Sequence, residues 1–547
     1  MLKAELNLPS DVHQLHAIVV DLQEEKYKNE VEIRYLNERI KQLTHQLYGR
    51  KSEKLLPDDH FEQSSLFDDA GTPDNAEPAS VDEIITVPAH TRKKKGGRKI
   101  LSQHLPCIEI EHDIPESEKQ CGCGSQMSRI GQEVSERLEM VPAHFWVERH
   151  IRPKYACKNC EGVEGEDGSS NVKIATCPPQ LLPKTISSPS LLSHVLVGKF
   201  CDSLPFYRQE TQFLRLGFSL TRATMCNWAI KVADTCKPIL DLLHQEILSG
   251  PLINVDESWF QVLKEGGRSP GSNSYIWVYR GGMPDRIGVI YRYNASRSGT
   301  EAQEFLGDYR GNILTDGYSG YDFLDIREGI VHAGCWAHVR RKYIDVTGPK
   351  NVKNKHNLSG MGKAGKALQF IQELYVIEAN ARKRGLGPEL LREERQLKSK
   401  PILDEFKEWL TIIGPQIPPK SLLGKAFIYT QSQWHRLIKY LDDGTISIDN
   451  NWAENAVRPF VVGRKNWLFA DTIDGAKANA AIYSLIETAK CNGLEPYQYF
   501  CYLFEKLPVA QDEDQLKALL PMNLTAELLE EHQKAYRLKG TLAVKKI

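Results

Sequence analysis

The chain has 547 residues, which is more than one hydrophobic core usually organises, so we expect several domains of a multidomain α/β protein. Its 41% apolar and 26% charged residues are ordinary for a soluble protein, and a formal net charge of -1 excludes attraction to nucleic acid through overall charge. Because no apolar run is long enough to span a bilayer and no signal segment is evident, we expect a cytoplasmic protein with no membrane partner.

Residues 11–50 carry an apolar heptad repeat. Its two seam positions hold Val12, Val19, Ile33, Ile40 and Leu47, and Leu15, Leu22, Leu36 and Leu43. Val or Ile at one position with Leu at the other favours a parallel coiled coil, so we predict a homodimer or higher oligomer through this helix. A single amphipathic helix docked on its own protein is the alternative.

The charge of the chain reverses after the heptads. Residues 57–89 contain many Asp and Glu but no Lys or Arg, and we predict an acidic disordered linker over residues 51–91. A basic segment, residues 92–106, follows and contains Lys93, Lys94, Lys95 and Arg98. We assign these four side chains to DNA phosphates or the minor groove, and a solvated tether is the alternative.

Two close cysteine pairs mark residues 107–180 as a zinc-binding domain. The pairs are Cys121 with Cys123 and Cys157 with Cys160. Four thiolates make a closed tetrahedral shell, so the sequence predicts a structural Zn²⁺ with no open position for catalysis. Four reduced surface thiols are the alternative.

Residues 181–245 predict a helical domain that resembles a helix-turn-helix. Two helical stretches are joined through Gly217 and Phe218, and the second begins near Ser219 or Thr221. Its expected outward and core-facing residues are Arg222, Thr224 and Asn227, and Met225, Trp228 and Ile230. Arg222 is the predicted DNA contact, whereas a three-helix linker without DNA contact is the alternative.

Residues 246–500 predict a catalytic domain. Three successive strand patterns, a short helix and a fourth strand that stops at Asp316 are followed by a plausible fifth strand in IVHAGCW. This is the layout of an RNase H-like core, a mixed sheet flanked by helices, with Asp256 on the first strand beside Asp316. Strongly helical sequence at about 350–445 predicts a helical insertion, and residues 501–547 form a C-terminal segment.

Three carboxylates, Asp256, Asp316 and Glu454, are the candidate catalytic residues. Two divalent ions need several anionic oxygens at one place, so these residues predict a site for Mg²⁺ (or Mn²⁺) and phosphodiester chemistry. Glu257 competes with Asp256, because successive strand side chains point to opposite faces and only one of the two can join the cluster. Asp449 competes with Glu454.

Basic side chains follow the third carboxylate. Arg458 lies one helical turn after Glu454, and we assign it to DNA together with Arg464 and Lys465. An exposed Glu454–Arg458 ion pair is the structural alternative.

The CWAHVRRK segment holds a further pair of metal-ligating residue types. Cys335 and His338 are two ligands, too few for zinc, which favours a role in packing or in supporting the site residues near Asp316. The basic residues that follow are expected to contact phosphate or to form a solvated helix face; they are Arg340, Arg341 and Lys342.

Taken in order, the motifs of the chain resemble the transposases of the insertion sequence 66 family over nearly the whole length. They are LYGRKSEK, KKKGGRK, CGCG, CKNC, VDES, TDGYSGYD, CWAHVRRK, DNNWAENAVRP, GRKNWLF and IETAKCNGLEPYQYF. The resemblance implies a DDE transposase with an RNase H-like domain interrupted by helices, and it favours Asp256, Asp316 and Glu454. It also implies binding to element ends and target DNA, accessory proteins of the same element, and a place at the bacterial nucleoid.

Two other functions fit parts of the same pattern. A non-catalytic zinc-containing DNA-binding regulator derived from a transposase would leave the three acidic segments unexplained. A nuclease that cuts without joining would keep all three carboxylates.

Overall fold

The computed structural model describes residues 145–156, 172–347 and 362–534, with scattered residues between 11 and 33. The chain divides into two compact units, one of residues 57–151 and one of residues 1–56 with 152–547. The predicted acidic linker, the basic segment and the four zinc-binding cysteines lie outside the described residues, as does most of the heptad seam. Residues 20–26 are helical, and the seam residue Leu22 is 58% exposed in the single chain.

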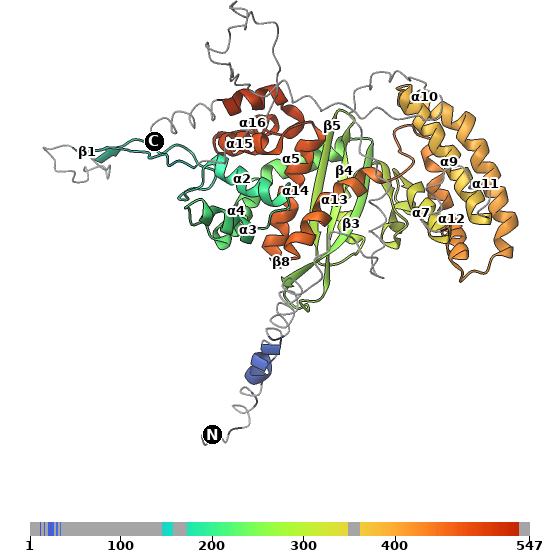
Figure 1. The fold of residues 1–547 in the computed structure, drawn as a ribbon, viewed down its shortest axis with the longest axis horizontal. Helices are drawn as coiled ribbons and strands as arrows, with labels where there is room; N and C mark the ends of the chain where they lie inside the picture. The colour runs from blue at the N-terminus through green and yellow to red at the C-terminus, as the bar shows by residue number, and fades with distance from the viewer. Residues whose placement is uncertain are drawn as a thin grey trace, which may run out of the picture. The chain divides into compact units, whose positions relative to one another are not determined.

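A six-stranded mixed sheet lies at the centre of the larger unit (Figure 1). Its order is β5-β4-β3-β6-β7, with β8 beside the far end of β3. Strands β3, β4 and β5 are antiparallel neighbours, whereas β6 and β7 run parallel to β3. The strands are β3 (Leu252–Lys264), β4 (Asn273–Met283), β5 (Arg286–Asn294), β6 (Gly311–Thr315), β7 (Ile330–Gly334) and β8 (Phe469–Thr472). The predicted mixed sheet flanked by helices is confirmed.

Helices precede, interrupt and follow the sheet, and a separate two-stranded sheet pairs β1 (Lys154–Ala156) with β2 (Val172–Ile174). The helices outside the insertion include α2 (Pro189–Phe200), α3 (Phe206–Arg215), α4 (Arg222–Thr235), α5 (Lys237–Ser249), α6 (Thr300–Leu306), the 3-10 helix η3 (Ser319–Ile326), α7 (Trp336–Thr347), α13 (Asn451–Trp467), α14 (Ile473–Cys491), α15 (Pro496–Lys506) and α16 (Glu513–Ala518). Several begin at a side chain that accepts a hydrogen bond from the first helical turn, as Thr221 does for α4 and Thr472 for α14. Among the described residues, no helix combines the length and apolarity that crossing a membrane requires.

Helix α14 closes the open edge of strand β5. The Ser484 and Thr488 hydroxyls accept hydrogen bonds from the backbone N–H groups of Tyr291 and Val289, at 2.8 and 3.0 Å. The two hydroxyls are four residues apart and therefore lie on one face of the helix. An uncovered edge would present unpaired backbone groups to another chain, so this polar stripe ends the sheet.

Different helices cover the two faces of the sheet. Helix α5 packs on β4 and β5, where Ile247 lies so close that a Cβ on Gly288 would sit 2.8 Å from its Cγ1 atom. Helix α13 lies over β3, where Asn254 Nδ2 donates to Asn450 Oδ1 at 2.9 Å just before the helix begins. The ladder register and the alternation of strand side chains place these contacts on opposite faces.

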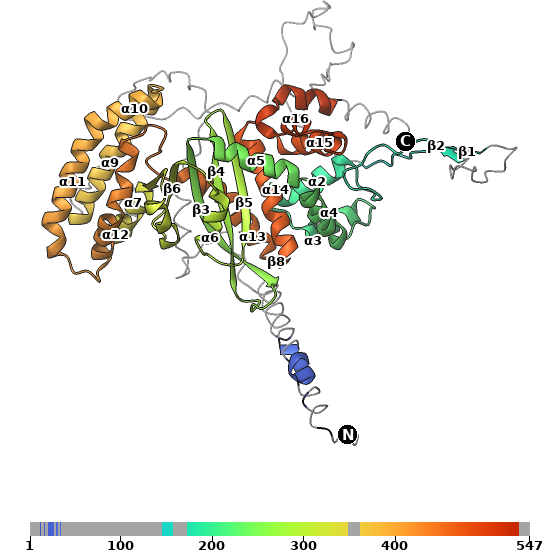
Figure 2. The same cartoon turned by 180° about the vertical axis from the view of Figure 1, so that it is seen from behind.

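A helical insertion separates β7 from α13. Its elements are α9 (Gly362–Lys383), α10 (Pro388–Glu394), the π-helix η5 (Arg395–Ser399), α11 (Lys400–Ile413), the 3-10 helix η6 (Gly414–Gln416), α12 (Leu422–Leu437) and the 3-10 helix η7 (Lys439–Leu441). Figure 2 shows these helices grouped beside the β6 and β7 end of the sheet, while α2, α4, α15 and α16 lie toward β5. The insertion shares one apolar core with the sheet, in which Leu314, Trp336 and Phe406 are buried together.

Candidate active site

Asp256 and Asp316 lie at corresponding places on neighbouring parallel strands. The β3–β6 ladder pairs Ile253 with Ile313 and Asn254 with Leu314. Continued by two residues, the same register sets Asp256 opposite Asp316, which directly follows the last residue of β6. Both residues are half-buried. The strand pairing therefore brings together two carboxylates that are far apart in sequence.

The adjacent carboxylates Asp256 and Glu257 face opposite sides of the sheet. Asp256 shares its face with Asn254, which contacts the start of α13, because the two positions are two residues apart on β3. Glu257 is buried on the other side, where Arg297 Nε donates to Oε1 at 2.7 Å and the Tyr321 hydroxyl donates to Oε2. The Glu257 carboxylate is thus already paired, while Asp256 faces the helix that carries Glu454.

Glu454 lies in the first turn of α13 and is 7% exposed. Arg341 Nη2, from α7, lies 2.5 Å from both of its carboxylate oxygens. This buried environment does not fit the exposed Glu454–Arg458 ion pair considered from the sequence. The competing carboxylate, Asp449, instead accepts a hydrogen bond at 2.9 Å from the hydroxyl of Tyr375 on α9.

The electrostatics of these carboxylates suit a bound cation. Burial, followed by the charges of Glu257, Glu454 and Asp316, raises the pKa of Asp256 well above its ordinary value. Burial also raises the pKa of Glu454, although Arg341 opposes the shift. Several anionic oxygens held together at a cost in free energy are the donor set that Mg²⁺ or Mn²⁺ prefers, because the ion relieves both the repulsion and the lost hydration. The residues present therefore fit a divalent metal.

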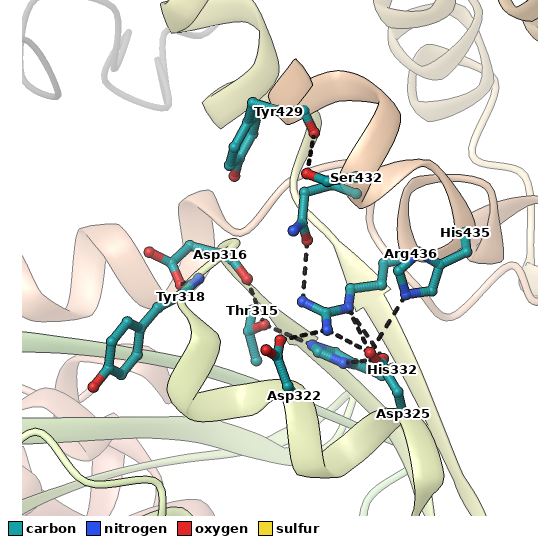
Figure 3. Close-up of polar contacts among 11 residues, drawn as sticks. Thr315, Asp316, Tyr318, Asp322, Asp325, His332, Tyr429, Ser432, His435 and Arg436 are labelled. Carbon is teal, nitrogen blue, oxygen red and sulfur yellow. Dashed lines mark hydrogen bonds and ion pairs between the residues drawn. The ribbon is translucent and has the colours of Figure 1, made fainter. Parts of the chain in front are cut away.

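A buried polar network contacts the end of β6 next to Asp316 (Figure 3). His332 Nε2 lies 2.8 Å from the hydroxyl of Thr315, the residue before Asp316, and His332 Nδ1 lies 2.7 Å from Asp325 Oδ1. Arg436 Nε, from insertion helix α12, donates to Asp325 Oδ1 at 3.0 Å. Burial and the Arg436 charge lower the pKa of His332 to about 4, so its imidazole is neutral near pH 7. The network ties η3, β7 and the insertion to the end of β6.

Sequence reasoning missed the contacts that Arg341 and Arg297 make with carboxylates. Arg341 is separated from Glu454 by 113 residues, and Arg297 from Glu257 by 40. Neither spacing belongs to a helix or strand repeat, so no local pattern in the sequence indicates these pairs.

The unusual ionisation of Glu257 gives a pH prediction. Burial, followed by the charge of Asp316, raises its pKa from the ordinary 4.5 to about 7. Below about pH 4.5 the side chain is protonated in both states, and its contribution to stability is fully present. Between about pH 4.5 and 7 the folded protein keeps this proton while the unfolded chain has released it. The contribution is therefore lost as the pH rises through 7. We expect the free energy of unfolding of the wild type, minus that of Glu257→Gln, to fall across this window.

Urea denaturation at constant ionic strength, with a chelator present, measures this difference. The subtraction is needed because two buried histidines have the opposite pH dependence. Burial lowers the pKa of His332 to about 4 and that of His338 to about 3, so both histidines make the protein more stable as the pH rises. A difference between wild type and variant that does not change with pH would contradict the prediction.

Comparison with known proteins accounts for most of the chain. Residues 184–478 match the family described as the IS66 family of transposases, and residues 484–522 match its C-terminal element. The chain belongs to the IS66 transposase family. Residues 118–161 match the zinc-finger binding domain of IS66 transposases, and residues 35–110 match a family described as transposase C of IS166 homeodomain.

Relatives of this IS66-family chain match most of its length. The uncharacterized protein y4jD of Sinorhizobium fredii (strain NBRC 101917 / NGR234) is 32% identical over 541 residues, which cover 95% of this chain and 98% of the relative. The uncharacterized protein y4qI of the same strain is 29% identical over 564 residues, covering 96% and 99%. The family supports the predicted zinc module, since the matched zinc-finger residues include all four predicted cysteine ligands.

The predicted DNA-binding side chains of the family member lie in different surroundings. Arg222 is exposed in the first turn of α4, and Lys465 is exposed near the end of α13. Arg458 is half-buried. Arg464 is buried, stacks on the Trp259 ring, and donates to the Trp259 carbonyl and, at 3.2 Å, to a serine hydroxyl of β3. We therefore do not carry Arg464 forward as a DNA contact.

Proposed function

We propose that this IS66-family protein is a DDE transposase that binds the ends of its insertion sequence and catalyses metal-dependent DNA cleavage and strand transfer. Asp256, Asp316 and Glu454 are the proposed catalytic residues, on a core that we assign as RNase H-like. The observation that carries the proposal is the register of β3 and β6, which sets Asp256 opposite Asp316. Asp256 lies on the face of the sheet that α13 covers.

The sheet order supports the RNase H-like assignment. Three antiparallel strands followed by two strands parallel to the first place β3 at the centre, with the acidic ends of β3 and β6 as neighbours. A helix that returns over β3 then supplies the third carboxylate. In the proposed site, the helical insertion would separate the triad in sequence while α13 returns its third carboxylate to β3.

The three carboxylates would hold Mg²⁺ (or Mn²⁺). When bound, the ions lower the pKa of the attacking water or 3′ hydroxyl and stabilise the leaving oxygen in an in-line displacement. Asp256 and Asp316 would hold the ions from the sheet, and Glu454 would hold them from α13. Arg341 holds Glu454 in place in the ion-free protein, and Asn450, which donates to the Val255 carbonyl at 2.8 Å, fixes the start of that helix against β3.

Incubation of purified protein with Mg²⁺, labelled duplexes from the DNA that flanks its own gene, and a target plasmid tests the proposal. A transposase gives joined product. Cleaved ends without joining would indicate the nuclease, and binding without cleavage would indicate the DNA-binding regulator or a missing accessory protein of the element.

Helix α4 is the proposed DNA-reading helix. It follows α3 through a turn that contains Gly217, in the left-handed region at φ 81°, and buries Met225 and Trp228 while Arg222 and Asn227 stay exposed. Two helices joined in this way support a helix-turn-helix, in which the first residues of the second helix would approach the bases.

Replacing Arg222 should weaken DNA binding without unfolding the protein. We expect Arg222→Ala to weaken binding to the element ends by about 1–3 kcal/mol if the side chain contacts a base, and otherwise to lower the salt dependence by about one phosphate contact. Lys237→Ala, an exposed cation at the start of α5, is the matched control and should change binding little. Fluorescence anisotropy over a range of salt concentrations measures both. Equal effects of the two substitutions would remove α4 as the reading helix.

A further inference from the structure

A thiol, an imidazole and a carboxylate meet beside the proposed catalytic residues. Cys335 lies between β7 and α7, His338 lies in the first turn of α7, and Glu454 comes from α13. One ligand atom from each lies within 4.8 Å of the other two. The sequence offered only Cys335 and His338, so the third candidate ligand is supplied by the fold.

The orientation of each side chain suits metal ligation. His338 Nδ1 is buried, lies 3.6 Å from Glu454 Oε1, and has no hydrogen-bond partner within the described part of the chain. Around tetrahedral zinc, with bonds of about 2.0–2.1 Å to nitrogen and oxygen, two such ligand atoms are roughly 3.4 Å apart. The Cys335 sulfur accepts a hydrogen bond at 3.1 Å from the backbone N–H of Asn450.

The Arg341 guanidinium occupies the position next to Glu454 and His338 that a metal ion would take. Its Nη2 atom contacts both oxygens of Glu454, and its Nη1 atom lies 3.2 Å from His338 Nε2. One guanidinium thus touches two of the three candidate ligands. A metal ion that bound them would compete with Arg341 for the same carboxylate.

We propose that Cys335, His338 and Glu454 form a binding site for a thiophilic divalent cation of the Zn²⁺ class, in competition with Arg341. Thiolate and imidazole select such ions over Mg²⁺, which prefers oxygen ligands. Three protein ligands leave the fourth tetrahedral position to water. The site is distinct from the predicted four-cysteine site, and its existence does not depend on the proposed transposase activity. If Glu454 also serves the catalytic ions, Zn²⁺ bound here withdraws that carboxylate from them.

Metal counting on the full-length protein tests the site. After equilibrium dialysis against Zn²⁺ and elemental analysis, we expect the wild type to bind one more ion per chain than Cys335→Ser. Cys236→Ser is the matched control, because Cys236 is also buried but lies at the start of α5, outside the cluster. When metal-free protein is loaded with Co²⁺ in place of Zn²⁺, the sulfur-to-metal absorption should be lower in Cys335→Ser than in the wild type and unchanged in Cys236→Ser. Equal metal content and equal spectra in wild type and Cys335→Ser would overturn the proposal.

Two further variants keep the test decisive if Cys335→Ser does not fold, which circular dichroism would reveal. His338→Ala should lose the extra ion in the same way, because it removes a ligand whose side chain is 24% exposed. Arg341→Met should bind Zn²⁺ at least about tenfold more tightly, because the competing guanidinium is gone. If Arg341 were only a structural partner of Glu454, that variant would be less stable and would show no gain in zinc affinity. Neither readout requires DNA cleavage, so failure of the metal site and failure of the proposed function are distinguishable.

Discussion

Asp256→Asn should abolish DNA cleavage and joining while leaving the protein folded and able to bind element ends. The substitution removes an anionic metal ligand but keeps an oxygen in place to accept the hydrogen bond from the Glu257 backbone N–H, which is 2.9 Å long in the wild type. Loss of several kcal/mol of transition-state stabilisation corresponds to a fall in rate of about 1000-fold or more. Quantified joined product from labelled ends in Mg²⁺, compared between wild type and variant, measures the loss.

Glu257→Gln is the matched comparison for this experiment. It removes the same charge one residue further along the same strand, from a side chain that faces Arg297 and Tyr321 instead of α13. We expect it to slow joining by less than about tenfold. If Glu257→Gln abolished joining while Asp256→Asn preserved it, the assignment of the two carboxylates would be reversed.

Stability measurements separate a lost metal ligand from a damaged fold. Without divalent ions, Asp256→Asn should melt no lower than the wild type, because it relieves repulsion among carboxylates whose charges raise the pKa of Asp256. With Mg²⁺, the wild type should gain more thermal stability than the variant, since a ligand that binds only the folded state stabilises it. A variant that melts lower in chelator would make its inactivity uninformative.

Arg395→Ala should cost about 3–5 kcal/mol of stability in the helical insertion, the range expected when one partner of a buried ion pair is removed. The Arg395 side chain is 1% exposed and makes two hydrogen bonds of 2.8 Å to the carboxylate of Glu378 on α9. Its Nη1 atom also donates to the carbonyls of Tyr440 and Asp443, at 2.7 and 3.0 Å. The substitution leaves a buried carboxylate and two carbonyls without their donor. Urea unfolding followed by tryptophan fluorescence reports it, because Trp409 and Trp434 pack in the insertion core.

Two comparisons make this prediction specific. Lys400→Ala, in which the exposed pair with Asp404 is lost, should cost less than about 1 kcal/mol. A double variant, Arg395→Met with Glu378→Leu, should recover part of the loss, because it no longer leaves a buried charge unpaired. If Lys400→Ala were as damaging as Arg395→Ala, the buried contacts of Arg395 would not explain its effect.

Damage at Arg395 should also reach the proposed catalytic residues. The segment that leaves the insertion contains Asp443, which accepts a hydrogen bond at 2.7 Å from Asn312 on β6, and Asp449, which Tyr375 of α9 contacts. That segment leads directly into α13 and Glu454. The insertion therefore helps to position the third carboxylate in addition to separating it in sequence.

The sequence alone predicted five of the six strands of the central sheet, the order of the motifs and the family, but not β8. Each of these rests on local information: runs of apolar residues give strands, and the three acidic segments can be recognised without their neighbours in space. The two helices in residues 206–235 were predicted in the same way, with the second expected to begin near Ser219 or Thr221, and the structure caps it with Thr221.

Only the tertiary structure distinguishes Asp256 from Glu257, and Glu454 from Asp449, as candidate metal ligands. Alternation along a strand guarantees that Asp256 and Glu257 point apart, but the face that receives α13 decides which of them points toward Glu454. Likewise, Asp449 and Glu454 differ through partners from distant segments, Tyr375 and Arg341.

The same reason explains the buried cations and the candidate metal cluster. Arg464 is one turn from the end of an amphipathic helix and would suit a phosphate, yet it packs against β3 because α13 crosses the sheet there. Cys335 and His338 gain a third candidate ligand only when Glu454 follows after more than a hundred residues of intervening chain. Sequence spacing determines what a side chain can offer, and the packing of distant elements determines what it meets.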